Sequence, residues 1–220
     1  MPTLFVTATS TDVGKTYVTC ALIRTLRAQG RAVDAFKPAL SGYTRYEGSD
    51  AALLLDALGQ PASGVDRMSP LRFAAALAPP SAARAEGKSV DQGVLNRLCR
   101  IRMGEIGEGL LLIEGIGGVM SPIADGATSI DLICDLEVPA ILVAGSYLGS
   151  VTHTLTAIES LKARYVPISA VIVSESAGDN PDLEEMTLAM AEFVRGIPVF
   201  VAPRAPDWDA SALATHLVGA

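Results

Sequence analysis

The apolar residues of this chain gather in six short continuous runs rather than in alternating patterns. The runs cover residues 3–8, 32–38, 109–115, 139–145, 168–174 and 197–202. Continuous apolar runs of this length are typical of strands that are buried on both faces, as in a parallel sheet covered by helices. The pattern therefore predicts six central strands.

Segments with helical periodicity separate these strands. They predict helices over residues 15–30, 49–59, 89–103, 152–165 and 180–196, while residues 76–87 indicate a surface loop with a helix start. In the first segment Val18, Leu22 and Leu26 share one helical face, and Gly30 follows as a natural end. Strands that alternate with helices predict a doubly wound α/β fold, with a mainly parallel sheet and helices on both faces.

Composition narrows the class of protein. The chain has 220 residues, 50% of them hydrophobic, which favours one domain over residues 1–220. A net charge of -7 argues against a nucleic-acid binder. The N-terminus lacks the features of a secretion signal, and no apolar run reaches the roughly 20 residues of a membrane span. Cys20, Cys99 and Cys134 form no CxxC pair, so we expect a reduced, cytoplasmic protein.

The end of the first strand carries a candidate phosphate-binding loop. Residues 9–13 lead to Gly14, Lys15 and Thr16, and a long amphipathic helix follows. In such a loop, N–H groups at the helix N-terminus face the phosphates, and the helix dipole favours negative charge. Lys15 would reach the β- and γ-phosphates, and the Thr16 hydroxyl would bind Mg²⁺. The standard motif places a glycine five residues before Gly14, where this chain has Thr9.

Ionisable residues stand near the ends of the next two strands. Lys37 closes the second strand and Glu114 the third, and ligands bind beyond the carboxyl ends of strands in this class of sheet. Lys37 is either a solvated lysine or one that binds a phosphoryl group. A carboxylate ending an apolar strand is costly if unpaired, so Glu114 predicts a metal or cationic partner. Asp50 is either a helix cap or a second acid on Mg²⁺.

Glycines mark two further places where a ligand could approach the backbone. Residues 115–118 follow Glu114 as a glycine-rich turn. After the fourth strand, Gly149 and Ser150 open a helix whose first turn is a second potential anion site. For His153, in that same turn, we favour a structural role.

Five motifs, taken together and in order, resemble the dethiobiotin synthetase family along nearly the whole chain. They are TSTDVGKT, KPALSG, GSDA, EGIGG and GSYLGSVTHTL. The family carries a phosphate loop with one more residue between its glycines than the standard motif. Its first glycine therefore aligns with Ala8, and Thr9 belongs to the variant. By this resemblance the loop is a specialised form and not a degraded one.

The resemblance implies a homodimeric, P-loop NTPase-like enzyme that acts on small molecules. It would use ATP and Mg²⁺ to carboxylate 7,8-diaminononanoate with CO₂ and close the ureido ring of dethiobiotin, releasing ADP and phosphate. Lys37 and Lys15 would be catalytic, and Thr16, Asp50 and Glu114 would hold Mg²⁺. The implied nucleotide contacts are Asp12, Val13, Gly14, Lys15, Thr16, Tyr17, Asp50, Glu114, Gly115, Ile116, Gly117, Ser174 and Pro203. The implied substrate contacts are Thr11, Ser41 and Gly118, with Leu148, Gly149 and Ser150 offered by the partner subunit.

Besides Ala8, two residues depart from the family pattern. Ile116 stands where alanine is usual, and we expect it to crowd the site. Ser174 stands where many members have the asparagine that reads adenine. A serine offers one hydroxyl in place of an amide donor and acceptor, so we expect a looser choice of nucleotide.

Two other classes of protein share parts of these motifs. Amide-forming synthetases of the cobyrinate type usually carry a glutaminase region, which this sequence does not show. Partitioning ATPases, which act as switches, carry a lysine early in the loop, where this chain has Ser10, Thr11 and Asp12.

Overall fold

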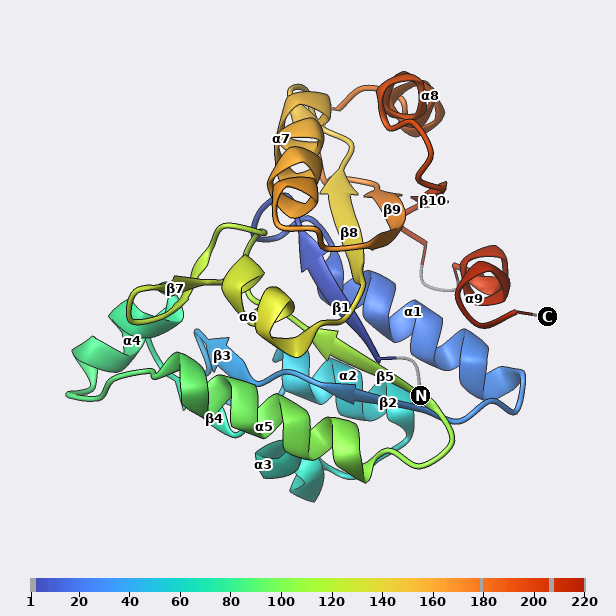
Figure 1. Ribbon diagram of the computed structural model, residues 1–220. Helices are drawn as coiled ribbons and strands as arrows, with labels where there is room; N and C mark the ends of the chain where they lie inside the picture. Colours follow the sequence, from blue (N-terminus) through green and yellow to red (C-terminus); the bar gives the residue numbers. More distant parts are fainter. Residues whose placement is uncertain (1–2, 179, 206–207, 220) are drawn as a thin grey trace.

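The fold is built on one sheet of six parallel strands. The computed structural model describes residues 3–178, 180–205 and 208–219. The strands follow the order β10–β9–β8–β1–β5–β2, and every neighbouring pair is parallel (Figure 1). Their bounds are Thr3–Ala8 (β1), Val33–Phe36 (β2), Leu110–Glu114 (β5), Ala140–Gly145 (β8), Ile168–Ser174 (β9) and Val199–Ala202 (β10). All six predicted strands are confirmed.

The strands are apolar throughout because both of their faces are buried. Phe5 and Leu111 belong to one hydrophobic core, whereas their neighbours Leu4 and Leu112 belong to a second core on the other face. Burying a side chain of this size contributes about 1.5–3 kcal/mol. A polar residue is therefore tolerated on these strands chiefly at their ends, which is where the ionisable residues lie.

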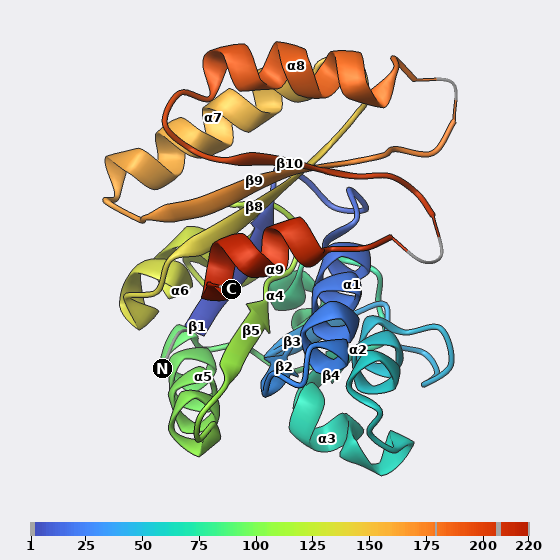
Figure 2. The same ribbon diagram turned by 90° about the vertical axis from the view of Figure 1, so that its right-hand side faces the viewer.

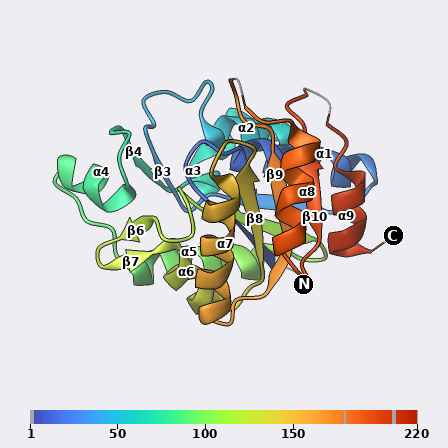
Figure 3. The same cartoon turned by 90° about the horizontal axis from the view of Figure 1, so that it is seen from above.

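Helices cover both faces of the sheet, as predicted. One face carries α1 (Lys15–Ala28), α2 (Asp50–Leu58) and α9 (Ser211–Val218). The other carries α5 (Gln92–Glu105), α6 (Ser129–Leu136), α7 (Ser150–Ala163) and α8 (Leu183–Phe193). Figure 2 shows α7 and α8 on one side of β8–β10 with α9 on the other. Seen from above, α5, α6 and α7 lie apart from α1, α2 and α9 (Figure 3).

Several short elements escaped the sequence patterns. They are β3 (Ala39–Ser41), β4 (Leu71–Phe73), β6 (Pro122–Ala124), β7 (Ala127–Thr128), a 3₁₀ turn at Ala62–Gly64 and α3 (Val65–Met68), besides α6 and α9. Helix α4 (Pro79–Ala85) lies within residues 76–87, where the sequence indicates a surface loop with a helix start. Helix α6 had a readable signal, because Thr128 and Asp131 form a reciprocal capping box at its start. None of the helices in the described part of the chain is long and apolar enough to cross a membrane.

The strand order opens a crevice beside β1. From β1 the chain runs out to the edge strand β2, returns to β5, and then crosses to β8 on the other flank of β1. Loops that leave neighbouring strands in opposite directions diverge at such a point, and ligands of doubly wound sheets bind there. The phosphate-loop residues and Glu114 leave the sheet at this point.

Candidate active site

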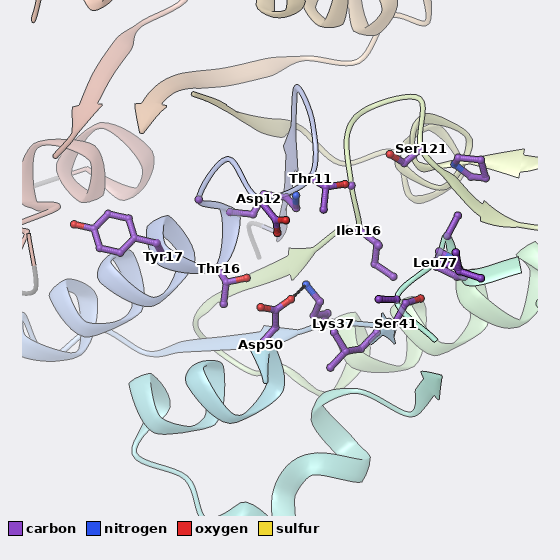
Figure 4. Close-up of a pocket in the computed structure, with 18 of the residues that line it drawn as sticks. Thr11, Asp12, Thr16, Tyr17, Lys37, Ser41, Asp50, Leu77, Ile116 and Ser121 are labelled. Carbon is purple, nitrogen blue, oxygen red and sulfur yellow. Dashed lines mark ion pairs between the residues drawn. The ribbon is translucent and has the colours of Figure 1, made fainter. Parts of the chain in front are cut away.

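The crevice holds a cavity of about 710 Å³, which is in the range of small-molecule sites. Its walls come from the loop after β1, the segment after β2, the start of α2 and the turn after β5 (Figure 4). The predicted residues that line it are Thr11, Asp12, Gly14, Lys15, Thr16, Tyr17, Lys37, Ser41, Asp50, Ile116 and Gly117. The fold therefore brings together residues that lie more than 100 positions apart in the chain.

The phosphate loop is shaped by a glycine that no other residue could replace without strain. Gly14 has φ +98°, and a Cβ atom there would lie 2.3 Å from the hydroxyl of Ser174. Helix α1 starts directly after it without a side-chain cap, so its first N–H groups are left for a ligand. Lys15 is buried and donates to the carbonyl of Ser10 at 3.2 Å.

The floor of the cavity is a buried group of charges centred on Lys37. Its ammonium lies 2.6 Å from Glu114 Oε1 and 2.7 Å from Asp50 Oδ2. The Thr16 hydroxyl donates to the same Glu114 oxygen at 2.7 Å. Lys37 and Glu114 are 2% and 0% exposed, so this pair is shielded from water. Asp50 is not the cap of α2, because the Ser49 hydroxyl accepts the capping bond; the Asp50 carboxylate pairs with Lys37 instead.

The pKa values of the two lysines are shifted in opposite directions. Burial on its own would lower the pKa of Lys37, but the charges of Glu114 and Asp50 outweigh it and raise that pKa. Burial, and then repulsion from Lys37, lowers the pKa of Lys15 to about 8. Asp50 is also desolvated, yet the ammonium of Lys37 holds its pKa below the usual range. The site is therefore built to keep Lys37 charged.

The oxygens around Lys37 also suit a hard cation. Glu114 Oε2 is buried and has no hydrogen-bond partner among the described residues, although a carboxylate oxygen is costly to leave unpaired. Two carboxylates and a hydroxyl form the oxygen set that Mg²⁺ prefers. Thr16, Asp50 and Glu114 meet as the sequence predicted, and they fit this ion.

Besides Glu114, which lies beneath the floor and bonds Lys37 and Thr16, eight predicted residues lie outside the lining of the cavity. Val13 is buried in the core, Gly115 packs against the Phe5 ring and Gly118 against the backbone of Thr9. Ser174 lies under Gly14, and Pro203 accepts a hydrogen bond from Tyr17. The remaining three, Leu148, Gly149 and Ser150, begin α7 away from the cavity. For any of these eight residues to contact a ligand in the cavity, the contact would have to come through the backbone, a rearrangement or a second copy of the chain.

The start of α7 has features of its own. Leu148 is 87% exposed, Gly149 has φ +95°, and the buried Ser150 hydroxyl has no partner within the described residues. His153 Nδ1 lies 2.8 Å from the Tyr147 hydroxyl. That contact agrees with the structural role favoured for His153.

Sequence reasoning missed several residues of the cavity wall. They are Leu40, Ala76, Leu77, Ala78, Pro79, Ser121, Pro122 and Arg204. Ser121 accepts a hydrogen bond from the Gly118 N–H at 2.7 Å and so holds the glycine-rich turn in place. Ser121 lies directly after that turn and could have been suspected; Arg204 reaches the cavity from a distant loop and carried no local signal.

Fold and site together define a nucleotide-binding α/β protein of the P-loop class. A family model described as an AAA domain matches residues 2–203. The MinC:MinD cell division protein complex of Aquifex aeolicus aligns with 98% of this chain and 86% of its own chain, at a TM-score of 0.55 and 13% identity. At that identity the likeness concerns the fold alone.

Curated relatives narrow the class to one family. The ATP-dependent dethiobiotin synthetase BioD of Caulobacter sp. (strain K31) is 50% identical over 100% of this chain and 96% of its own length. That of Phenylobacterium zucineum (strain HLK1) is 51% identical over 93% and 89%. The chain belongs to the ATP-dependent dethiobiotin synthetase family, as its motifs indicated.

The close fit of Gly14 gives a first testable prediction. We expect Gly14→Ala to weaken ATP binding at least about tenfold, because the new Cβ would push the loop away from Ser174. Gly30→Ala is the matched control, since Gly30 has φ +71° with nothing within 4 Å of a Cβ. It should lose about 1–2 kcal/mol of stability and no affinity. Calorimetric ATP titration and thermal unfolding measure both; a Gly14→Ala variant with normal affinity would contradict this account.

Proposed function

We propose that this protein catalyses the ATP- and Mg²⁺-dependent carboxylation of 7,8-diaminononanoate with CO₂ and the closure of the ureido ring of dethiobiotin, with release of ADP and phosphate. The observation that carries the proposal is the buried Lys37, held between Glu114 and Asp50 beside Lys15 at the floor of the cavity. Identity of about half the residues with named dethiobiotin synthetases supports it.

The reaction brings negatively charged groups together. One amine of the diamine adds to CO₂ and loses a proton, which gives a carbamate. A carbamate oxygen then attacks the γ-phosphorus of ATP, ADP leaves, and a carbamic–phosphoric anhydride forms. The second amine attacks its carbonyl carbon and expels phosphate, which closes the ring. A carbamate and a triphosphate repel each other, so the site must supply positive charge.

The residues of the cavity meet this demand. Lys15 and the first N–H groups of α1 would bind the β- and γ-phosphates, and Lys37 would face the phosphoryl group as it is transferred. Thr16, Asp50 and Glu114 would hold Mg²⁺, which when bound neutralises phosphate charge. The Ser41 hydroxyl, buried and without a partner among the described residues, would accept or donate a hydrogen bond to the diamine. Burial of Lys15, Lys37 and Glu114 strengthens their interactions by excluding water.

Release of phosphate that depends on the diamine tests the function directly. The purified protein with ATP, Mg²⁺ and bicarbonate should release phosphate only when 7,8-diaminononanoate is added, and dethiobiotin should appear in equal amount by mass spectrometry. Steady ATP hydrolysis without diamine, and no dethiobiotin with it, would refute the proposal and favour a switch-type ATPase.

The central lysine should be essential for turnover. Lys37→Met removes the charge but keeps the apolar stem, and we expect a loss in kcat on the order of 100-fold or more. Lys88→Met is the control, because Lys88 is an exposed lysine paired with Glu86. Circular dichroism should show that both variants are folded. Turnover of Lys37→Met within about threefold of the parent would remove Lys37 from the reaction.

The two carboxylates should set the requirement for Mg²⁺. Glu114→Gln and Asp50→Asn each remove one charge from a site for a hard cation, so both should shift the Mg²⁺ dependence of ATP binding to higher concentrations. Asp56→Asn, an exposed position further along α2, should leave the dependence unchanged. Titration of Mg²⁺ at fixed ATP by calorimetry measures this. Unchanged curves for both site variants would mean that the ion binds elsewhere.

We expect the active protein to be a homodimer. Residues 148–150 lie outside the cavity of their own chain, so if they bind the substrate, they must do so in a second copy. Sedimentation in the presence of substrates should give twice the 22.8 kDa of one chain. A fully active monomer would contradict this expectation.

A further inference from the structure

Two serines join the loops that follow β8 and β9. The Ser146 N–H donates to the Ser176 hydroxyl at 3.0 Å, and the Ser176 N–H donates to the Ser146 hydroxyl at 2.9 Å. The backbone pairing of the two strands ends just before them, at Gly145 and Ser174. The two side chains therefore continue the connection between the neighbouring strands where the backbone ladder stops.

This serine pair has little room to rearrange. Ser146 is 1% exposed, so its bonds are shielded from water. A Cβ atom at Gly145 would lie 2.7 Å from the Ser176 hydroxyl and 2.6 Å from the Tyr147 ring. Only a glycine at position 145 lets both side chains come this close. The pair is therefore built into the end of β8.

Ser146 opens the segment that leads into α7. Within this segment the Ser150 N–H donates to the Tyr147 carbonyl at 3.0 Å, and the side chain of Tyr147 packs against the core on the α1 face of the sheet. Residues 146–150 are thus fixed at their start by Ser176 and further along by Tyr147. The orientation of the first turn of α7 depends on both attachments.

The first turn of α7 is suited to a negatively charged group. No side chain of the described residues caps this helix, so N–H groups of its first turn have no helical acceptor. The Ser150 hydroxyl is buried and has no partner within the part of the chain that the structure describes. In the proposed reaction the substrate carries a carboxylate at the end opposite its two amines, and residues 148–150 of a second copy are expected to bind it.

We propose that Ser176 is a positioning residue for the substrate: together with Ser146 it fixes the first turn of α7 in the orientation that receives the substrate carboxylate in the partner's site. The proposal rests on the function and the homodimer put forward above. In the described structure neither serine lines the large cavity, so the pair would act through the helix and not by contact with the diamine.

A pair of probes that differ only in the carboxylate provides the test. Calorimetry on the intact protein, with Mg²⁺ and ATP but without bicarbonate, compares 7,8-diaminononanoate with 2,3-diaminononane, which has a methyl group in place of the carboxylate. For Ser176→Ala we expect a Kd for 7,8-diaminononanoate that is about threefold to tenfold higher, the range for one neutral hydrogen bond. The Kd values for 2,3-diaminononane and for ATP should equal those of the parent. Ser160→Ala, a control further along α7 whose hydroxyl donates to the Thr156 carbonyl, should change none of them.

A merely structural role of the pair would give a different result. Equal weakening of both diamines in Ser176→Ala would overturn the proposal, and so would an unchanged Kd for 7,8-diaminononanoate. Ser146→Ala removes the other bond of the pair and should weaken 7,8-diaminononanoate alone in the same way. This second variant decides the matter if Ser176→Ala does not fold.

Mixed dimers show in which copy the helix acts. In a dimer of one Ser176→Ala chain and one Lys37→Met chain, the remaining active site has an intact Lys37 and receives α7 from a chain with Ser176, so its KM for the diamine should match the parent. If both substitutions are in one chain and the other chain is the parent, the KM should rise. The reverse pattern would overturn the assignment of α7 to the partner's site.

The calorimetric test can fail independently of the proposed function. A parent protein that binds the diamine as described but forms no dethiobiotin would refute the function and leave this inference standing. Binding of the diamine with equal affinity by the parent and Ser176→Ala, together with formation of dethiobiotin, would do the opposite. A parent protein that does not bind the diamine would overturn both.

Discussion

The buried ammonium of Lys37 between Glu114 and Asp50 is the interaction on which the site depends. Each of the three charges comes from a different element: the end of β2, the end of β5 and the start of α2. A single charge buried there would be strongly unfavourable, whereas a hydrogen-bonded group of opposite charges is tolerated. The parallel sheet makes the group possible, because its strands bring their carboxyl ends to one edge.

This arrangement explains why two lysines can lie close together. Lys15 and Lys37 repel each other. Burial is the main cause of the lowered pKa of Lys15, and this repulsion is the second. The carboxylates compensate for that repulsion, and they also leave Glu114 Oε2 available to a cation. The same group of charges thus serves two purposes: it stabilises the apo site and it defines where Mg²⁺ and phosphate oxygens would be held. A site of this kind has its charges oriented before the substrates arrive, which is what electrostatic catalysis requires.

Much of this could be predicted from the sequence, for identifiable reasons. The six central strands are apolar on both faces and carried a strong local signal, and Gly14, Lys15 and Thr16 followed one of them directly. Helix α9 spans only eight residues, too few for a clear period, and α6 is equally short, although the capping box at its start could have been read. Arg204 and the partners of Tyr17 depend on contacts across more than 180 positions. Spacing along the chain carries no information on such contacts.

The two ends of the cavity are held by interactions of very different strength. Around Lys37, removal of one partner would leave a buried charge unpaired, which costs about 3–5 kcal/mol. Residues 203–205 are held by weaker bonds: the Tyr17 hydroxyl donates to the Pro203 carbonyl, and Glu175 accepts from the backbone N–H of Arg204. A neutral hydrogen bond contributes about 0.5–1.5 kcal/mol. A change near residues 203–205 is therefore expected to cost less stability than the removal of one charge around Lys37.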